Sequence, residues 1–194
     1  EIYDRWAFNH SVNENESRKF RDTLKIASML HDVGKVAISD LILKKPSRFT
    51  EEEYKIIQGH TWLGAKLFNE IESQVDRVAR EVALTHHENW DGTGYPGQVS
   101  TETGLPLFID TETGKPLPLK GEEIPISGRI VALADVYDAL SCKRVYKEAW
   151  TEEKVLDEIK SLRGTKFDPE VVDAFFEILP SIQAIRSRFP DTEE

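Results

Sequence analysis

The chain has 194 residues, a formal net charge of −10 and 39% hydrophobic residues, which suits one globular domain with a sizeable core. The acidic balance argues against a duplex nucleic-acid binder, because such proteins need a basic face. The single cysteine, Cys142, excludes an intrachain disulfide framework, and no apolar run reaches the roughly 20 residues of a membrane span, so we expect a soluble cytoplasmic domain without membrane contact.

The predicted secondary structure is mainly α, because alternating strand patterns are scarce. Five stretches are typical of helices: 20–32, the stretch after Thr50, 75–87, 128–140 and the stretch after Thr151. The second of these opens with a capping box of Thr50 and Glu53. A sixth helix is predicted after Asp168, an N-cap that is followed by proline at the first helical position.

Two stretches of the chain, 1–16 and 97–124, differ from the predicted helices. We expect residues 1–16 to be the tail of an upstream helix and a loop, in a protein that carries a sensory or receiver domain before this one. Residues 97–124 are rich in Gly, Pro and Thr and contain TETG twice, at 101 and at 111. Each TETG predicts a turn, so this insertion is either a surface hairpin or loop, or a lid or partner surface beside the site.

Imidazoles and carboxylates lie in several of the predicted helices. Four of the five histidines have helical, largely apolar contexts: His31, His60, His86 and His87. Asp135 interrupts an apolar helix, where a buried carboxylate is costly without a cation. Helical bundles build dinuclear metal sites from such groups on separate helices, and Asp32 would bridge the two ions. Adjacent helical residues differ by about 100°, so His86 and His87 are expected to serve two neighbouring ions.

Two longer motifs make the chain recognisable. HDVGK stands at 31–35 and HHENWDGTGYP at 86–96, and GRIVALADVYDAL, KRVYK and TKFDP follow. From about residue 20 to the end, the sequence resembles the HD-GYP family, a subgroup of HD-type metal phosphohydrolases that degrade cyclic di-GMP. The resemblance implies a single domain over 1–194, an HD-type multi-helix bundle with a long loop or hairpin insertion after the GYP motif.

The resemblance also implies a metal site. Its ligands would be His31, Asp32, His60, His86, His87 and Asp135. The resemblance implies two or three divalent ions, and mixed imidazole and carboxylate ligands suit iron or manganese. Some family members hold a third ion with an upstream Glu and His, but here the upstream histidine is His10 in a loop-like context, so we do not expect it to be a ligand.

The remaining site residues follow from the same motifs. Lys35 and Asp32 would be catalytic, and substrate would be bound by Gly94, Tyr95, Pro96, Arg144 and Lys147. Supporting roles at the site, in orienting imidazoles or capping the turn, are expected for Glu88, Asp91 and Asp138, and a packing role for Trp90. The implied reaction is hydrolysis of cyclic di-GMP to linear pGpG, GMP or both.

Two alternatives remain open at this point. One is an HD phosphohydrolase that acts on another nucleotide, such as a different cyclic dinucleotide, and the other is a non-catalytic module that binds cyclic di-GMP or docks a cyclase. A cyclase partner and a homodimer are compatible with either.

Overall fold

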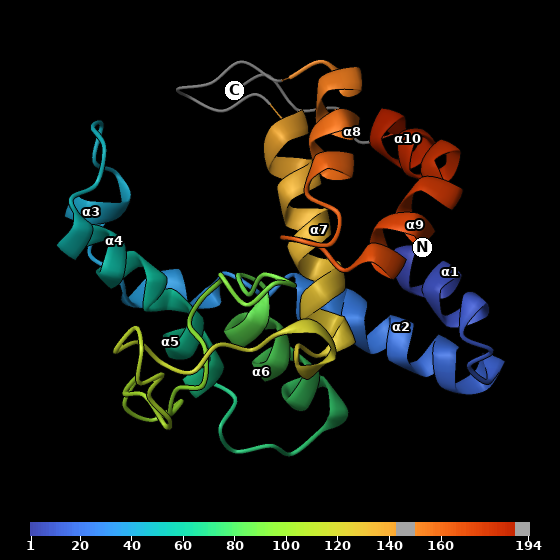
Figure 1. The fold of residues 1–194 in the computed structure, drawn as a ribbon. Helices are drawn as coiled ribbons and strands as arrows, with labels where there is room; N and C mark the ends of the chain where they lie inside the picture. Colours follow the sequence, from blue (N-terminus) through green and yellow to red (C-terminus); the bar gives the residue numbers. More distant parts are fainter. Residues whose placement is uncertain (143–149, 189–194) are drawn as a thin grey trace.

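The computed structural model describes residues 1–142 and 150–188 (Figure 1). Within these ranges the chain is a bundle of helices without a regular β-sheet, which confirms the mainly α fold expected from the sequence. The α-helices are α1 (Ile2–Asn9), α2 (Glu14–Ser28), α3 (Asp40–Leu43), α4 (Glu51–Gln58), α5 (His60–Lys66), α6 (Gln74–Thr85), α7 (Ile126–Ser141), α8 (Glu152–Ser161), α9 (Pro169–Glu177) and α10 (Leu179–Arg188). Two 3₁₀ helices, η1 (Val33–Ala37) and η2 (Gly121–Glu123), follow α2 and precede α7.

Helix α6 organises the half of the bundle in which the histidines lie. It packs against α2, α5 and α7, and α5 also packs against η1. The apolar residues of α6 recur at helical spacing, so Val78, Ala79, Val82 and Ala83 are buried together. In Figure 1, α4 and α3 extend away from this half, beyond α5.

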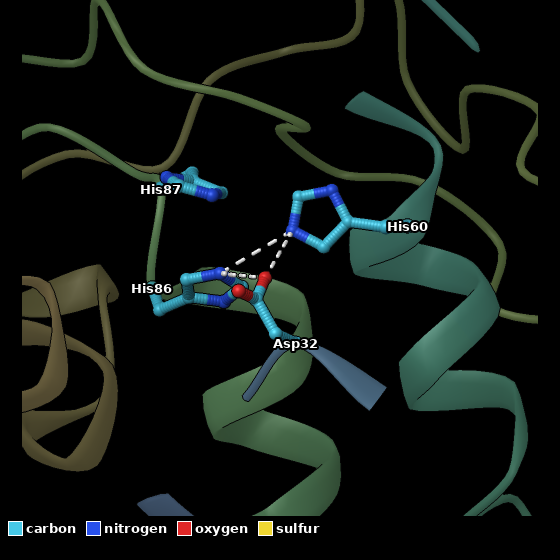
Figure 2. A group of neighbouring side chains, drawn as sticks. All are labelled: Asp32, His60, His86 and His87. Carbon is cyan, nitrogen blue, oxygen red and sulfur yellow. Dashed lines mark hydrogen bonds and ion pairs between the residues drawn. The ribbon is translucent and has the colours of Figure 1, made fainter. Parts of the chain in front are cut away.

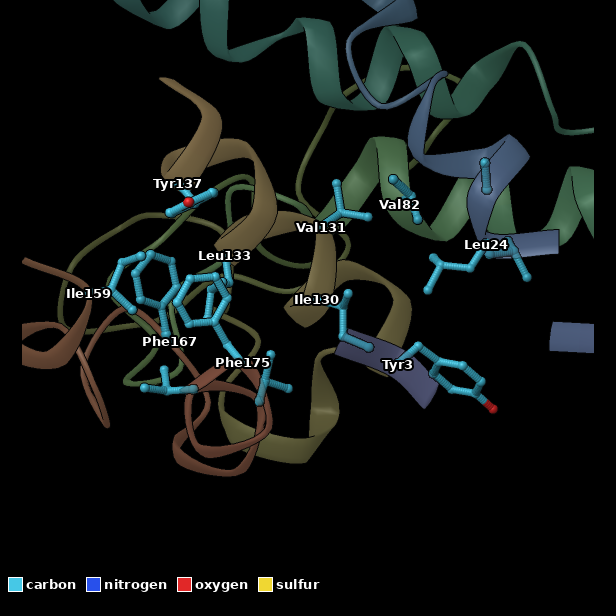
Figure 3. Close-up of a cluster of buried hydrophobic side chains, with 14 of the residues drawn as sticks. Tyr3, Leu24, Val82, Ile130, Val131, Leu133, Tyr137, Ile159, Phe167 and Phe175 are labelled. Carbon is cyan, nitrogen blue, oxygen red and sulfur yellow. The ribbon is translucent and has the colours of Figure 1, made fainter. Parts of the chain in front are cut away.

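The other half holds the largest buried side chains. Helix α7 packs against α6 and also against α8 and α9. Its mostly apolar sequence lets it bury side chains against all three helices. Leu133 of α7 meets Ile159, Phe167 and Phe175 in the core shown in Figure 3. Each fully buried side chain of this size stabilises the fold by about 1.5–3 kcal/mol. Among the described residues, no helix is both long and apolar enough to cross a lipid bilayer.

The predicted helix starts are confirmed where a capping residue marks them. Thr50 and Glu53 form the expected capping box at α4. Asp168 caps α9 by accepting a hydrogen bond from the backbone N–H of Glu170, and Pro169 follows it. These contacts are local, which is why the sequence alone reveals them.

Two other boundaries differ from the sequence pattern. Helix α2 begins at Glu14, capped by Asn13, and ends at Ser28 rather than continuing to residue 32. The stretch after Thr50 forms two helices, α4 and α5, separated by a turn at Gly59. This break lets α5 lie against η1 and α6 while α4 extends outward. Helix ends of this kind depend on packing partners that a local pattern does not contain.

The insertion over 97–124 forms two successive tight hairpins, which confirms the hairpin expectation. Isolated antiparallel bridges pair Val99 with Pro106 and Ile109 with Pro116. The two TETG turns close alike: the glycine N–H donates to a carbonyl oxygen four residues earlier, at 2.8 Å in each hairpin. The first hairpin is fixed to α5, because Lys66 Nζ donates to the carbonyl oxygen of Glu102 at 2.9 Å. The lid and partner-surface alternatives stay predictions.

His10 lies apart from the other histidines. It ends α1, which packs against α2 and α9. Its Nε2 atom lies 2.9 Å from a carboxylate oxygen of Glu170 on α9, and its Nδ1 atom lies 2.7 Å from the carbonyl oxygen of Trp6. The Nε2 contact links the end of α1 to α9, and the Nδ1 contact stays within α1. The expectation that His10 is not a ligand stays a prediction.

Candidate metal and phosphate site

Four side chains from three parts of the bundle converge (Figure 2). Asp32 precedes η1, His60 is the first residue of α5, and His86 and His87 follow the last turn of α6. One ligand atom from each of the four lies within 4.8 Å of the others. The geometry therefore brings together four of the six ligands expected from the sequence.

Backbone carbonyls orient the imidazoles. The Nδ1 atoms of His31, His60 and His86 each lie 2.6 to 3.0 Å from a carbonyl oxygen three or four residues earlier. A carbonyl only accepts, so Nδ1 carries a proton, and in the neutral ring Nε2 keeps its lone pair. Imidazoles that bind metal ions are held in this way through their second nitrogen. The helix ends thus present three Nε2 atoms toward the site, each with a lone pair when its ring is neutral.

One oxygen of Asp32 faces two of these lone pairs. Asp32 Oδ1 lies 3.3 Å from His60 Nε2 and 3.8 Å from His86 Nε2, and the two Nε2 atoms are 3.4 Å apart. Oδ1 is buried and accepts no hydrogen bond from the described residues. Lone pairs that face one another without a proton repel, and a divalent cation removes that repulsion. The donor set and the unpartnered oxygen therefore fit a metal ion.

The other oxygen of Asp32 faces a second set of groups. Asp32 Oδ2 lies 2.5 Å from Lys35 Nζ and 3.4 Å from His31 Nε2, which is in turn 3.7 Å from Asp135 Oδ1. Burial raises the pKa of Asp32, but His31 and Lys35 beside its Oδ2 outweigh burial and hold that pKa well below its usual range. The carboxylate is therefore ionised, with one oxygen toward each set. This arrangement supports a bridging role, which stays a prediction.

Burial keeps two of the imidazoles neutral. It lowers the pKa of His60 to about 4 and the pKa of His87 to about 2. Neutral imidazole is the form that binds metal ions, so both rings are ready to bind at neutral pH.

The two adjacent histidines lie closer together than helical spacing implies. The rings of His86 and His87 have centroids 4.1 Å apart and are tilted by 42°. Helix α6 ends at Thr85, so the rotation of about 100° per residue no longer applies at His87. Both residues contribute to one four-residue cluster, and their division between two ions stays a prediction.

The GYP turn folds back over His87. Tyr95 stacks on His87 with ring centroids 4.8 Å apart and an interplanar angle of 25°, and the Tyr95 N–H donates to the His87 carbonyl at 3.1 Å. At Gly94, a Cβ atom would lie 2.2 Å from the backbone nitrogen of Asn89, so only glycine allows this path. Glu88 ties the end of the turn, because its Oε1 accepts from the N–H of Gly97 at 2.6 Å.

A family model described as HD domain matches residues 5–108 and 111–171 of the chain. The chain belongs to the HD domain family. The resemblance to HD-type phosphohydrolases drawn from the two motifs is therefore confirmed.

Relatives of this HD domain include curated phosphodiesterases. It is 40% identical to the 3'3'-cGAMP-specific phosphodiesterase 2 of Vibrio cholerae over 188 residues, which are 97% of this chain and 31% of the relative. A cyclic di-GMP phosphodiesterase of the same organism is 42% identical over 167 residues, 84% of this chain and 30% of the relative. The chain thus spans under a third of the length of these two relatives.

A solved structure shows the same fold. The crystal structure of a cyclic GMP-AMP specific phosphodiesterase of Vibrio cholerae superposes with a TM-score of 0.54 at 18% identity. The match covers 97% of this chain and 45% of that one.

The TKFDP segment at 165–169 of the HD domain is hydrogen-bonded to the start of the GYP turn. The N–H groups of Trp90 and Asp91 donate to the carbonyls of Lys166 and Thr165 in TKFDP, at 3.1 and 2.9 Å. The Arg129 guanidinium lies 5.7 Å from the centroid of the Trp90 ring. The packing role expected for Trp90 stays a prediction, and the two hydrogen bonds to TKFDP anchor the turn that carries Tyr95.

Three residues at or behind the site were missed or undervalued by the sequence analysis. Arg129 of α7 donates to the buried carboxylate of Asp168 at 2.7 Å, and an arginine in an apolar helix was the available signal. Burial raises the pKa of Glu88 to about 7, and its Oε2 has no hydrogen-bond partner among the described residues. Tyr54 of α4 lies beside Tyr95, and no motif marked it.

The structure describes some of the remaining predicted site residues and not others. Arg144 and Lys147 lie outside the described residues, so their substrate-binding role stays a prediction. Pro96 continues the turn after Tyr95, and Asp91 caps this turn, because its Oδ1 accepts from the Thr93 N–H at 2.9 Å. Asp138 is exposed on α7, where the Cys142 thiol lies 3.5 Å from its Oδ1.

Gly34 sets how closely Asp32 approaches α5, which makes it a test of the site's assembly. A Cβ atom there would lie 1.9 Å from the carbonyl oxygen of His60 and 2.4 Å from the backbone nitrogen of Gly64. We expect Gly34→Ala to lower the free energy of unfolding by about 3 kcal/mol, because backbone atoms must separate. Chemical denaturation measures this. Gly64→Ala is the matched control, with its nearest contact at 3.1 Å, and an equal loss in both variants contradicts the prediction.

Proposed function

We propose that this HD domain is a metal-dependent phosphodiesterase that hydrolyses cyclic di-GMP to linear pGpG, GMP or both. The observation that carries the proposal is the convergence of Asp32 with His60, His86 and His87 beside the Lys35 ammonium group. The names of the curated relatives, cyclic di-GMP and cGAMP phosphodiesterases, support the same substrate class.

Two divalent ions, iron or manganese, form part of this proposal. The cluster of Asp32, His60, His86 and His87 would hold one, and His31 and Asp135 would join Asp32 around the other. When bound, such ions lower the pKa of water and neutralise phosphate charge.

The protein's own side chains provide orientation and charge. Lys35 is half-exposed and held at 2.5 Å from Asp32, so its ammonium group is poised to contact a phosphate oxygen and stabilise charge developing at phosphorus. Tyr95, held on His87, would contact the substrate next to it. Asp32 stays ionised because its pKa lies well below the usual range, so it does not serve as the acid. Water adds to phosphorus, the bond from phosphorus to the 3′ oxygen breaks, and that oxygen takes up a proton.

Turnover of cyclic di-GMP tests the proposal directly. The protein would be purified without oxygen, loaded with Fe²⁺ or Mn²⁺, and assayed by chromatography of the nucleotide products. We expect pGpG or GMP to form with metal and no product after chelation. A protein that neither hydrolyses nor binds cyclic di-GMP in the loaded form contradicts the proposal, and binding without turnover favours the non-catalytic module.

A second substrate belongs in the same assay. The relative that is 40% identical over 97% of this chain is named for 3'3'-cGAMP, the mixed guanine and adenine dinucleotide. Comparing kcat/KM for the two substrates decides between them. A sensory or receiver domain, a cyclase partner and a homodimer stay predictions.

A further inference from the structure

Three aromatic rings form a continuous row that leads outward from the metal-ligand cluster. Tyr95 stacks on His87, and Tyr54 meets Tyr95 edge to face, with centroids 6.5 Å apart and an interplanar angle of 71°. Burial is uneven along the row. Tyr95 is partly buried, and burial raises its pKa, whereas Tyr54 remains 49% exposed. An aromatic surface is therefore open to solvent at the outer end of the row.

Helix α4 holds Tyr54 at this place. Its start is fixed by the Thr50 capping box, and its end is fixed to the cluster because His60 Nδ1 donates to the Ile57 carbonyl at 2.6 Å. Tyr54 precedes Ile57 by three residues, which puts both on the same face of α4. The helix that supports a metal-ligand imidazole thus carries the exposed ring beside Tyr95.

The chemistry of the substrate matches an exposed aromatic surface. A cyclic dinucleotide of guanine or adenine carries two purine bases, one on each ribose of a charged sugar-phosphate ring. Under the proposed function, a phosphate is bound by Lys35 and by metal ions held at the metal-ligand cluster, which consists of Asp32, His60, His86 and His87. Proteins hold unpaired bases by stacking them on aromatic side chains. Tyr54 and Tyr95 offer such a surface to a base whose ribose adjoins the phosphate at Lys35.

We propose that Tyr54 is a substrate-binding residue that stacks against one purine base of the cyclic dinucleotide, beside Tyr95. This inference rests on the proposed function. Every base has a π-face, so stacking favours the presence of a base and not its identity. Tyr54 therefore raises the affinity for cyclic di-GMP and for the mixed guanine and adenine dinucleotide alike.

The test is a series of substitutions at Tyr54 in the metal-loaded protein. We expect Tyr54→Ala to raise KM for cyclic di-GMP about tenfold with kcat within about twofold of wild type. Tyr54→Phe keeps the ring and should keep KM, whereas Tyr54→Leu fills the space without a π-face and should behave like alanine. The ratio of kcat/KM for the two dinucleotides should not change in any variant. Metal content, measured by mass spectrometry, should equal that of wild type.

Ile56→Ala is the matched control. Ile56 lies two residues on, on the opposite face of α4, and is 47% exposed, so its truncation tests disturbance of the helix alone. An unchanged KM in Tyr54→Ala, or an equal rise in Ile56→Ala, overturns the role of Tyr54. Failure of the proposed function appears separately, as absence of hydrolysis and binding in the wild type, and it would remove the inference as well.

Discussion

Asp32→Asn is expected to lower kcat/KM for cyclic di-GMP at least about 1,000-fold, equivalent to about 4 kcal/mol of transition-state stabilisation. Both oxygens of Asp32 are used, one toward His60 and His86 and the other toward Lys35 and His31. The amide of asparagine offers these groups one oxygen and no negative charge. The amount of bound metal should therefore fall together with kcat/KM. Steady-state kinetics and metal analysis of the same preparation measure both effects.

The control for this variant is an aspartate that pairs only at the surface. Asp40 accepts from Lys44 at 2.8 Å, and both side chains are largely exposed. Asp40→Asn should leave activity and metal content unchanged. Wild-type activity in Asp32→Asn would contradict the assignment of Asp32 to the site.

The largest expected loss of stability follows from breaking the ion pair behind the GYP turn. The Asp168 side chain is fully buried, and the Arg129 side chain is only 11% exposed. Arg129→Met therefore leaves a buried carboxylate without its cation. An uncompensated buried charge costs about 3–5 kcal/mol, so the free energy of unfolding should fall by about that amount. Denaturant titration measures it.

The chain offers a matched surface pair for comparison. Arg163 and Asp173 also approach to 2.7 Å, but their side chains are 46% and 53% exposed. Arg163→Met should therefore destabilise the fold far less than Arg129→Met, because solvent already screens this pair. Equal losses from the two substitutions would show that burial does not set the strength of the Arg129 pair.

Local signals in the sequence predicted much of the fold. The Thr50 capping box, the Asp168 N-cap and the turns at TETG each depend on residues within a few positions, and each forms as expected. The end of α2 at Ser28 and the break at Gly59 were not predicted. Both are set by the fit of η1 against α5, which joins segments distant in sequence.

The residue types at the candidate site were also recognisable in advance, because the HDVGK and HHENWDGTGYP motifs are long and specific. Helical spacing, however, separated His86 from His87, and the structure brings them together because α6 ends just before them. Tyr54 had no signal, since its neighbour Tyr95 is reached only through the arrangement of α4 beside the GYP turn.

The sequence by itself determined the mainly α class, the helix caps, the hairpin insertion and the identity of the metal-ligand candidates, since these depend on residue type and short-range spacing. Only the tertiary structure decided which atoms meet. It turned the Nε2 atoms of His60 and His86 toward Asp32 Oδ1, placed the Arg129 cation on Asp168, and set Tyr54 at the outer end of the row through Tyr95 and His87. All of these contacts except the stacking of Tyr95 on His87 join residues tens of positions apart, and they form only when the helices of the bundle pack.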